Sequence, residues 1–315
     1  MKNHNRSTSK NVILMVLFIG LVISGCQERY HDIELPQLKP KLVINSIFNE
    51  GERFRVNVSA NLGRNSTEKY TPVTNATVNL FENGEWVEEL IGGQDTINIF
   101  GDTIGKWFYF SKKTLPKAGN IYRISVEAPN YEDVIAESKV PQKTIIHVVD
   151  TTWVNVDFEK YLRVYLEMRN PSEKNWFFLG TAYLNPIFSS SGAEDVPIIG
   201  YNKRYFTFRV NDPLIGTRER RIKEDFPLFS NELFSGDIYK FAIEVNQLNT
   251  DRGIFAVDLI TLSDEAYKYL QTLTDFKNND IRYSEPVKIF SNVNNGLGIF
   301  AAMNTSCDTV WVNNY

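Results

Sequence analysis

Short runs of alternating apolar and polar residues recur along most of this chain. The clearest run covers residues 161–168, in which every second side chain is Leu, Val or Met. Because successive side chains of a β-strand point to opposite faces, a period of two residues predicts a strand with one buried face. A helical period is confined to one segment, near residues 264–275. The pattern therefore predicts an all-β body with one substantial helix.

Residues 41–141 are predicted to form an immunoglobulin/fibronectin-like β-sandwich, because several short strands with turn signals follow one another there. Asn83 and Gly84 suit the two positive-φ positions of a type I′ hairpin turn. Residues 119–126 resemble the Gly-x-x-Tyr-x-apolar-x-Val strand of fibronectin-like and carboxypeptidase-regulatory-like sandwiches. A Gly-rich and polar loop is predicted just before a strand at residues 107–110.

Residues 142–315 are predicted to form a second β-rich domain, separate from the first, with the helix near residues 264–275. Ser263 is the expected N-cap of that helix, since its hydroxyl can accept a backbone N–H bond from the first turn. Two long loops are predicted, at Asn185–Arg204 and at Asn211–Glu232. Loops of that length usually carry function or are disordered.

The first 25 residues have the composition of a secretory signal peptide. Residues 1–10 are polar and basic, residues 12–23 are apolar apart from one glycine, and Ser24-Gly25 supply small residues before a cleavage point. The apolar segment is shorter than the roughly 20 residues that span a bilayer. These features predict export and the removal of residues 1–25.

Ile23-Ser24-Gly25-Cys26 resembles the lipobox of bacterial lipoproteins. The resemblance implies that Cys26 carries acyl chains such as palmitate and becomes the first residue of the mature chain. Each buried methylene contributes about 0.8 kcal/mol to membrane affinity, so two or more chains hold a protein firmly. The sequence therefore predicts a lipid anchor on Cys26.

The residues after Cys26 suggest where the anchored protein is sorted. Gln27 stands where lipoproteins retained in the inner membrane commonly carry Asp, which favours the outer membrane. Glu28, Asp32 and Glu34 loosely resemble an acidic signal that exports some lipoproteins to the cell surface, but a solvated linker has the same composition. Residues 26–40 are predicted to tether the body, and surface or periplasmic orientation stays open.

Charge and residue supply narrow the possible functions. Removing residues 1–25 leaves 31 cations against 38 acids, which changes the formal net charge from −4 to −7 and leaves no basic footprint for nucleic acid. His31 and His147 are the two histidines that remain, too few for a His-rich zinc site or a Ser–His–Asp triad. Cys307 is expected to be a small buried residue without a disulfide. We therefore expect a non-enzymatic protein without a metal or cofactor.

Several short motifs follow an opening strand at Leu42-Val43-Ile44. They are FSNELFSG at 229–236, YKYL at 267–270, PVKIFSNV at 286–293 and GLGIF at 296–300. In this order behind a lipobox, they resemble the Bacteroidota lipoproteins known as domain of unknown function 4249, from about Lys41 to the C-terminus. Asn294-Asn295 and Ala301-Ala302 depart from the glycine or acidic residues expected there.

That resemblance implies a role but no catalytic residues. Such lipoproteins are often encoded beside TonB-dependent outer-membrane transporters, which implies an accessory role in nutrient capture or uptake with the transporter as partner. The sequence leaves open an alternative, a structural or adhesive cell-surface lipoprotein.

The two predicted loops are the expected site of partner binding, because loops can vary without disturbing the sheets that hold them. Apolar residues flanked by charge suit a protein partner. The candidate residues are Ile198, Ile199, Tyr201, Arg218, Arg220, Arg221 and Phe226. The alternative is that the apolar side chains among them pack back onto the sheet.

Two further features each have two interpretations. Residues 296–300 could form a carboxylate-binding loop like that of PDZ domains, but a glycine-kinked strand entering the core is favoured. The tryptophans could form stacking platforms for a sugar, but cross-strand and core packing is favoured. These tryptophans are Trp86, Trp107, Trp153, Trp176 and Trp311.

Overall fold

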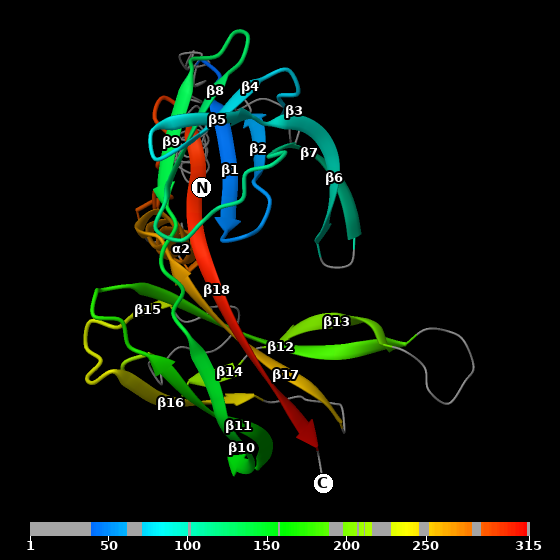
Figure 1. The fold of residues 1–315 in the computed structure, drawn as a ribbon, viewed down its shortest axis with the longest axis vertical. Helices are drawn as coiled ribbons and strands as arrows, with labels where there is room; N and C mark the ends of the chain where they lie inside the picture. Colours follow the sequence, from blue (N-terminus) through cyan, green and yellow to red (C-terminus); the bar gives the residue numbers. More distant parts are fainter. Residues whose placement is uncertain are drawn as a thin grey trace, which may run out of the picture. The chain divides into compact units, whose positions relative to one another are not determined.

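Three β-sheets and one helix, α2 (Asp264–Asn278), make up the regular structure of the described residues (Figure 1). The all-β prediction is therefore confirmed, and the helix lies where its N-cap and period placed it. The computed structural model describes residues 39–61, 71–99, 102–156, 158–188, 198–206, 208–210, 212–215, 228–245, 252–278 and 285–313. Among them, no helix has the length and apolarity needed to cross a membrane.

The largest sheet has ten strands. Along its main path, in spatial order, lie β13 (Ile198–Phe206), β12 (Trp176–Phe188), β17 (Arg252–Leu262), β18 (Leu297–Asn313), β1 (Leu42–Asn49), β2 (Arg55–Ala60), β7 (Asp102–Phe110) and β6 (Ile91–Ile99). Two short strands pair beside this path, β3 (Thr71–Pro72) with β2 and β15 (Leu228–Ser230) with β12.

Two four-stranded sheets complete the fold. The first contains β5 (Glu85–Glu89), β4 (Thr77–Glu82), β8 (Ile121–Glu127) and β9 (Val134–Lys139) in that order. The second contains β10 (Ile146–Val156), β11 (Glu159–Arg169), β16 (Ile238–Val245) and β14 (Phe208–Val210) in that order.

The predicted N-terminal sandwich is present. Its core joins residues of the β5-β4-β8-β9 sheet, such as Leu80 and Ile124, to residues of the large sheet, such as Ile44 and Val58. All four are fully buried, as the two-residue period requires. The predicted turn also forms, with φ of 52° at Asn83 and 91° at Gly84.

A second core lies between the other four-stranded sheet and the opposite part of the large sheet. Val164 and Leu166 of β11 pack there with Phe177 of β12 and Val257 of β17. The helix α2 covers the other face of the large sheet, where Ala266 packs in a smaller cluster with strand residues. The chain thus forms two sandwiches that share one sheet.

One strand corrects the predicted division into separate domains at 41–141 and 142–315. Residues 297–303 of β18 pair in parallel with β1, and residues 303–313 pair antiparallel with β17. The large sheet therefore runs through both halves, and residues 40–315 form one compact unit. At about 3.3 Å per residue, a strand of 17 residues is long enough to serve both cores. The alternation of β18 predicts a strand but does not specify its partners.

Two predicted loops are also corrected. Residues 91–99 and 102–110 form the hairpin β6–β7, with pairs from Ile91↔Phe110 to Ile99↔Asp102. Most of Asn185–Arg204 likewise belongs to the hairpin β12–β13. Glycine and polar residues concealed the strand period in both segments, because they interrupt the alternation of apolar and polar side chains from which a strand is recognised.

Candidate binding surfaces

The first group of predicted binding residues lies on a strand. Ile198, Ile199 and Tyr201 belong to β13, the edge strand of the large sheet. Ile198 is paired with Phe188, and Tyr201 is paired with Pro186. The sequence analysis placed these three residues on a loop. The structure instead brings them together on one strand.

The hairpin β12–β13 extends beyond its neighbour in the sheet. The pairing of β12 with β17 ends at Leu184↔Ile254, whereas its pairing with β13 continues to Phe188↔Ile198. Among the described residues, 185–188 and 198–202 therefore pair only with each other, and we call these two segments the arm. An edge strand offers unpaired backbone N–H and C=O groups, which can be joined by a strand of another protein.

The second group of predicted binding residues lies outside the described residues. It consists of Arg218, Arg220, Arg221 and Phe226, and the lipidation candidate Cys26 is outside them too. Of the loop predicted at Asn211–Glu232, residues 228–230 form β15, which pairs with the start of β12.

A second surface combines two arginines with two phenylalanines. The arginines lie on β2 and just before it, and the phenylalanines lie on β7. The Arg53 guanidinium carbon lies 4.8 Å from the centre of the Phe110 ring, and that of Arg55 lies 3.9 Å from the centre of Phe108. The two rings are 6.0 Å apart, and Arg55 is paired with Phe110 across the strands. We call these four residues the Arg–Phe patch. Sequence reasoning missed it, because its two halves are far apart in the chain.

The tryptophans differ in exposure. Trp86 and Trp311 are 58% and 64% exposed, whereas the other three tryptophans are partly buried. Cys307 is exposed rather than buried, because β18 turns the odd-numbered side chains beyond its contact with α2 to the outer face. Among the residues that the structure describes, no group of three His, Cys, Asp or Glu side chains could hold a metal.

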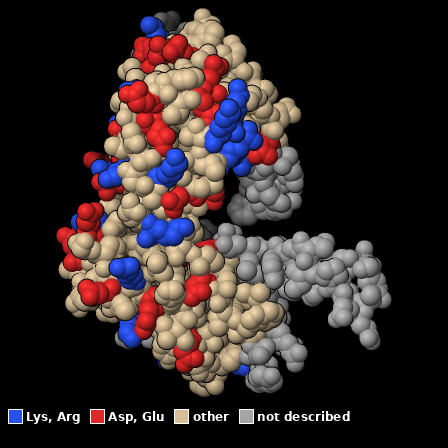
Figure 2. Space-filling model, viewed as in Figure 1, with Lys and Arg blue, Asp and Glu red and all other residues tan. Residues whose placement is uncertain are grey.

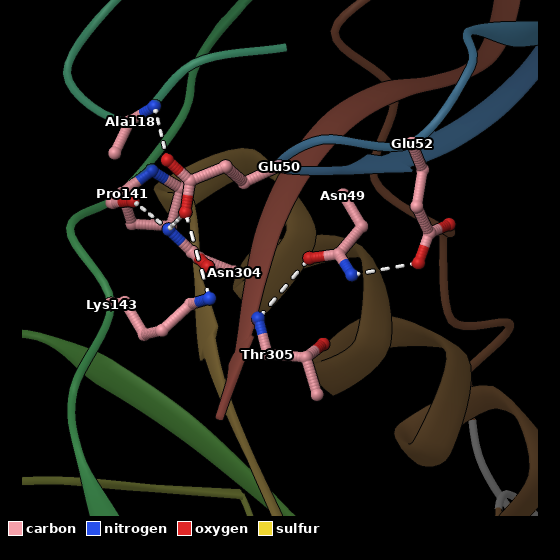
Figure 3. Close-up of polar contacts among 8 residues, drawn as sticks. All are labelled: Asn49, Glu50, Glu52, Ala118, Pro141, Lys143, Asn304 and Thr305. Carbon is pink, nitrogen blue, oxygen red and sulfur yellow. Dashed lines mark hydrogen bonds and ion pairs between the residues drawn. The ribbon is translucent and has the colours of Figure 1, made fainter. Parts of the chain in front are cut away.

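A polar joint connects the turn after β1 to β18 and to the segment before β10 (Figure 3). Glu50 accepts hydrogen bonds from the backbone N–H of Ala118 at 3.1 Å and from the Asn304 amide at 2.9 Å. The same Asn304 amide nitrogen donates to the Pro141 carbonyl at 3.0 Å, and Lys143 Nζ lies 3.8 Å from Glu50. Each of these contacts ties together segments that are distant in the sequence.

The joint continues at Asn49, whose Oδ1 accepts the Thr305 backbone N–H at 3.1 Å while its Nδ2 donates to Glu52 at 2.9 Å (Figure 3). The donors from Ala118 and Asn304 lower the pKa of Glu50. A carboxyl group whose pKa is lowered by folding stabilises the protein at any pH above its pKa in the unfolded chain. This stabilisation is lost as the pH falls through the pKa of the folded state. The joint therefore stabilises the fold, and its contribution weakens in acid.

Asn231, in the first motif of the sequence, holds a corner of the second sandwich. It is 6% exposed. Its Nδ2 donates to Asn170 Oδ1 and to the carbonyl oxygens of Pro171 and Glu173 at 2.9–3.0 Å. Its Oδ1 accepts the backbone N–H of Asn175 at 2.8 Å. One amide side chain therefore fixes the loop that leads into β12.

The glycine motif at 296–300 is the predicted glycine-kinked strand. Gly298 has a φ of +99°, and a Cβ at this position would overlap the carbonyl oxygen of Ile44 on β1. Phe300, two residues later, is fully buried in the N-terminal core. Glycine is needed here both for the positive φ and for the close approach of two backbones.

Comparison with known proteins identifies the family. A family model described as domain of unknown function (DUF4249) matches residues 28–308. The chain belongs to this family. No curated protein matches it.

Solved structures show only weak similarity to this DUF4249 chain. A putative membrane-anchored protein from Corynebacterium diphtheriae aligns at 8% identity and a TM-score of 0.17, covering 71% of this chain and 54% of its own. The collagen adhesin from S. aureus aligns at 7% identity and a TM-score of 0.18, covering 86% of this chain and 94% of its own. This chain therefore spans about half the length of the first. TM-scores this low support no inference about function.

The motifs that carried the resemblance to DUF4249 have structural roles in this chain. Asn231 and Gly298 hold a corner and a strand contact, and Tyr267 stacks on Trp176 at 3.7 Å between ring centres. Asn292 bonds both backbone groups of Phe300 with its side chain, at 3.0 Å and 2.7 Å. These motif residues thus hold the fold together, whereas the arm and the Arg–Phe patch lie outside the motifs.

Proposed function

We propose that this protein is an outer-membrane lipoprotein that binds a partner protein without catalysing a reaction, as an accessory to a TonB-dependent transporter in nutrient capture or uptake. The observation that carries the binding role is the arm. Among the described strands, the outer edge of this two-stranded extension pairs with no other strand, and an open edge is a risk of aggregation that proteins generally cover or use. Partner binding gives the arm a use.

The anchor supports the same proposal from the sequence side. A lipobox at Cys26, followed by a tether to Pro40, would hold the body near a membrane in which a transporter lies. A fully extended tether of 15 residues reaches about 50 Å, enough for the body to lie beside a membrane protein.

The anchor leads to a direct prediction. Cys26→Ala should abolish metabolic labelling with an alkyne palmitate analogue and leave the protein uncut or released from the membrane fraction, because no thiol remains to accept an acyl chain. Cys307→Ala is the matched control and should label normally. Unchanged labelling in Cys26→Ala would refute the lipoprotein assignment.

Partner binding is tested by co-purification with the transporter. Replacing Ser189–Asp195, which join the strands of the arm, by a short Gly-Ser linker should reduce recovery of the transporter by about tenfold, a loss of about 1.4 kcal/mol of binding. Replacing Arg220 and Arg221 by Ala should weaken recovery as well. Both variants should keep the wild-type melting temperature within a few degrees.

The control is a change far from the arm, Lys240→Gln on β16, which should keep full recovery. Full recovery of the transporter with both loop variants would contradict binding through these segments. If the wild-type protein recovers no transporter and instead mediates attachment of cells to a surface, the adhesive alternative is correct.

A further inference from the structure

We propose that the Arg–Phe patch is a docking surface for an acidic, extended segment of a partner protein. The inference rests on the proposed function only in assuming that a protein partner exists. It concerns a different surface from the arm, on the β2–β7 part of the large sheet.

The patch presents fixed cations. Each guanidinium lies over a phenylalanine ring at 4.8 Å or less, and Arg53 Nε also donates to the Ser111 carbonyl at 2.5 Å. Arg53 is exposed, and the end of its stacked guanidinium beyond Nε points away from the Ser111 carbonyl bond, so its terminal N–H groups can donate to a carboxylate. Nε and Nη2 of Arg55 are buried, and this guanidinium is already paired with Asp95. Because both side chains are already held in place, little rotamer entropy remains to be lost on binding.

Further cations extend the patch. Lys106 lies on β7 on the same face as Phe108 and Phe110, since its position in the strand has the same parity. Lys112 and Lys113 are exposed and follow directly after Ser111. Figure 2 shows Lys and Arg side chains gathered in a patch over the position of β7. In a chain whose formal net charge is −4, this local excess of cations is not a general property of the surface.

The acidic side chains beside the patch already have partners. Asp95 Oδ2 lies 3.3 Å from Arg55. Glu88 accepts the backbone N–H bonds of residues 112–114, and Glu52 accepts the side-chain amide of Asn49. The Arg53 guanidinium is therefore the cation best placed to take a carboxylate from outside.

The mixture of groups favours a polypeptide over a membrane surface. Three carboxylates on or beside this face would meet the closely spaced phosphates of an anionic bilayer with like charge, which is unfavourable. An extended peptide can place single carboxylates against Arg53 and the exposed lysines, and an apolar side chain against the half-buried Phe110 ring. Arg and aromatic residues are also the types that dominate the energetics of protein interfaces.

The test uses the mature, lipidated protein in detergent and two fluorescent 12-residue peptides. Both peptides contain the same Phe and Val residues, and one carries four Asp where the other carries Asn. Fluorescence anisotropy should show that the Asp peptide binds at least about tenfold more tightly than the Asn peptide. The preference should shrink as salt is raised from 50 mM to 500 mM, because surface charges are then screened.

Variants locate the binding. Arg53→Gln combined with Arg55→Gln should weaken Asp-peptide binding by about tenfold or more, whereas Lys240→Gln should leave it within about twofold. Arg53→Gln alone serves if the double variant is unstable, because Arg53 is exposed and outside the core. Equal binding of both peptides, or unchanged binding in these variants, would overturn the proposal.

A competition experiment distinguishes an acidic peptide from an anionic lipid as the ligand of the patch. Dihexanoyl phosphatidylglycerol should displace the Asp peptide no better than dihexanoyl phosphatidylcholine, and clear displacement by the former alone would assign the patch to a membrane surface instead. Loss of peptide binding with intact transporter recovery overturns only the patch. If the wild-type protein binds the Asp peptide but recovers no transporter, only the proposed function is overturned.

Discussion

Replacing Gly298 with Ala is expected to unfold or severely destabilise the protein. A Cβ at this position would overlap the Ile44 carbonyl oxygen and lie 2.9 Å and 3.0 Å from the Ile44 carbonyl carbon and amide nitrogen, all of them backbone atoms that cannot rotate away. The backbone φ of +99° adds strain for any residue with a side chain. To relieve the overlap, β18 would have to separate from β1. We expect a loss of at least about 4 kcal/mol in the free energy of unfolding, measured by urea titration.

Gly105→Ala is the matched control. Gly105 also lies in a strand, and a Cβ there would have nothing within 4 Å. Its substitution should change the free energy of unfolding by less than about 1 kcal/mol. If both variants lose the same stability, then glycine composition rather than the β1–β18 contact limits stability, and the role assigned to Gly298 is wrong.

Replacing Asn231 with Ala is expected to have the second-largest effect. The change leaves three carbonyl-type oxygens and one backbone N–H without their buried partner. An unsatisfied buried polar group costs about 1–3 kcal/mol, and water can reach some of these. We therefore expect a loss of about 3 kcal/mol, together with faster hydrogen exchange of the Asn175 amide.

Asn155→Ala on β10 provides the comparison, because Asn155 is exposed. It should alter stability by no more than about 0.5 kcal/mol. A stability of Asn231→Ala close to that of Asn155→Ala would show that the corner after β11 is held by other contacts.

The sequence predicted best those elements that local chemistry determines. In β11 the two-residue period buries Leu162, Val164, Leu166 and Met168, each 1% exposed or less. Ser263 acts as the N-cap of α2, since its hydroxyl accepts the backbone N–H of Ala266 at 3.2 Å. Such signals lie within a few residues of each other, so a single sequence is sufficient to recognise them.

Strand partners were not predictable in the same way. Val43 pairs with Leu297 across nearly the whole chain, and no local pattern in either strand names the other. The hairpin β12–β13 was concealed for a different reason. Pro186, Gly200 and Asn202 interrupt its apolar period, although the hydrogen-bonded pairing continues past them.

The candidate surfaces differ in the same way, since one lies on a single segment of the chain and the other combines two distant strands. Ile198 and Tyr201 were selected for an unusual combination of apolar residues and polar surroundings, and they lie on an edge strand. The Arg–Phe patch could not be selected, because Arg53 and Phe110 become neighbours only after β2 and β7 pair. A surface built from two distant strands leaves no motif in the sequence.

The position of β18 also constrains the order in which this protein can be completed. Every other strand precedes β18 in the chain, yet the N-terminal core needs its Phe300 and Ala302. During synthesis, the first half of the chain must therefore wait with β1 unpaired on one side until residues 297–303 have been made. Contacts between residues so distant in sequence form late and slowly. If the chain is exported with its N-terminus first, as the proposed lipoprotein would be, this delay would keep the polypeptide loosely folded and able to pass through a translocon before the last strand closes both sandwiches.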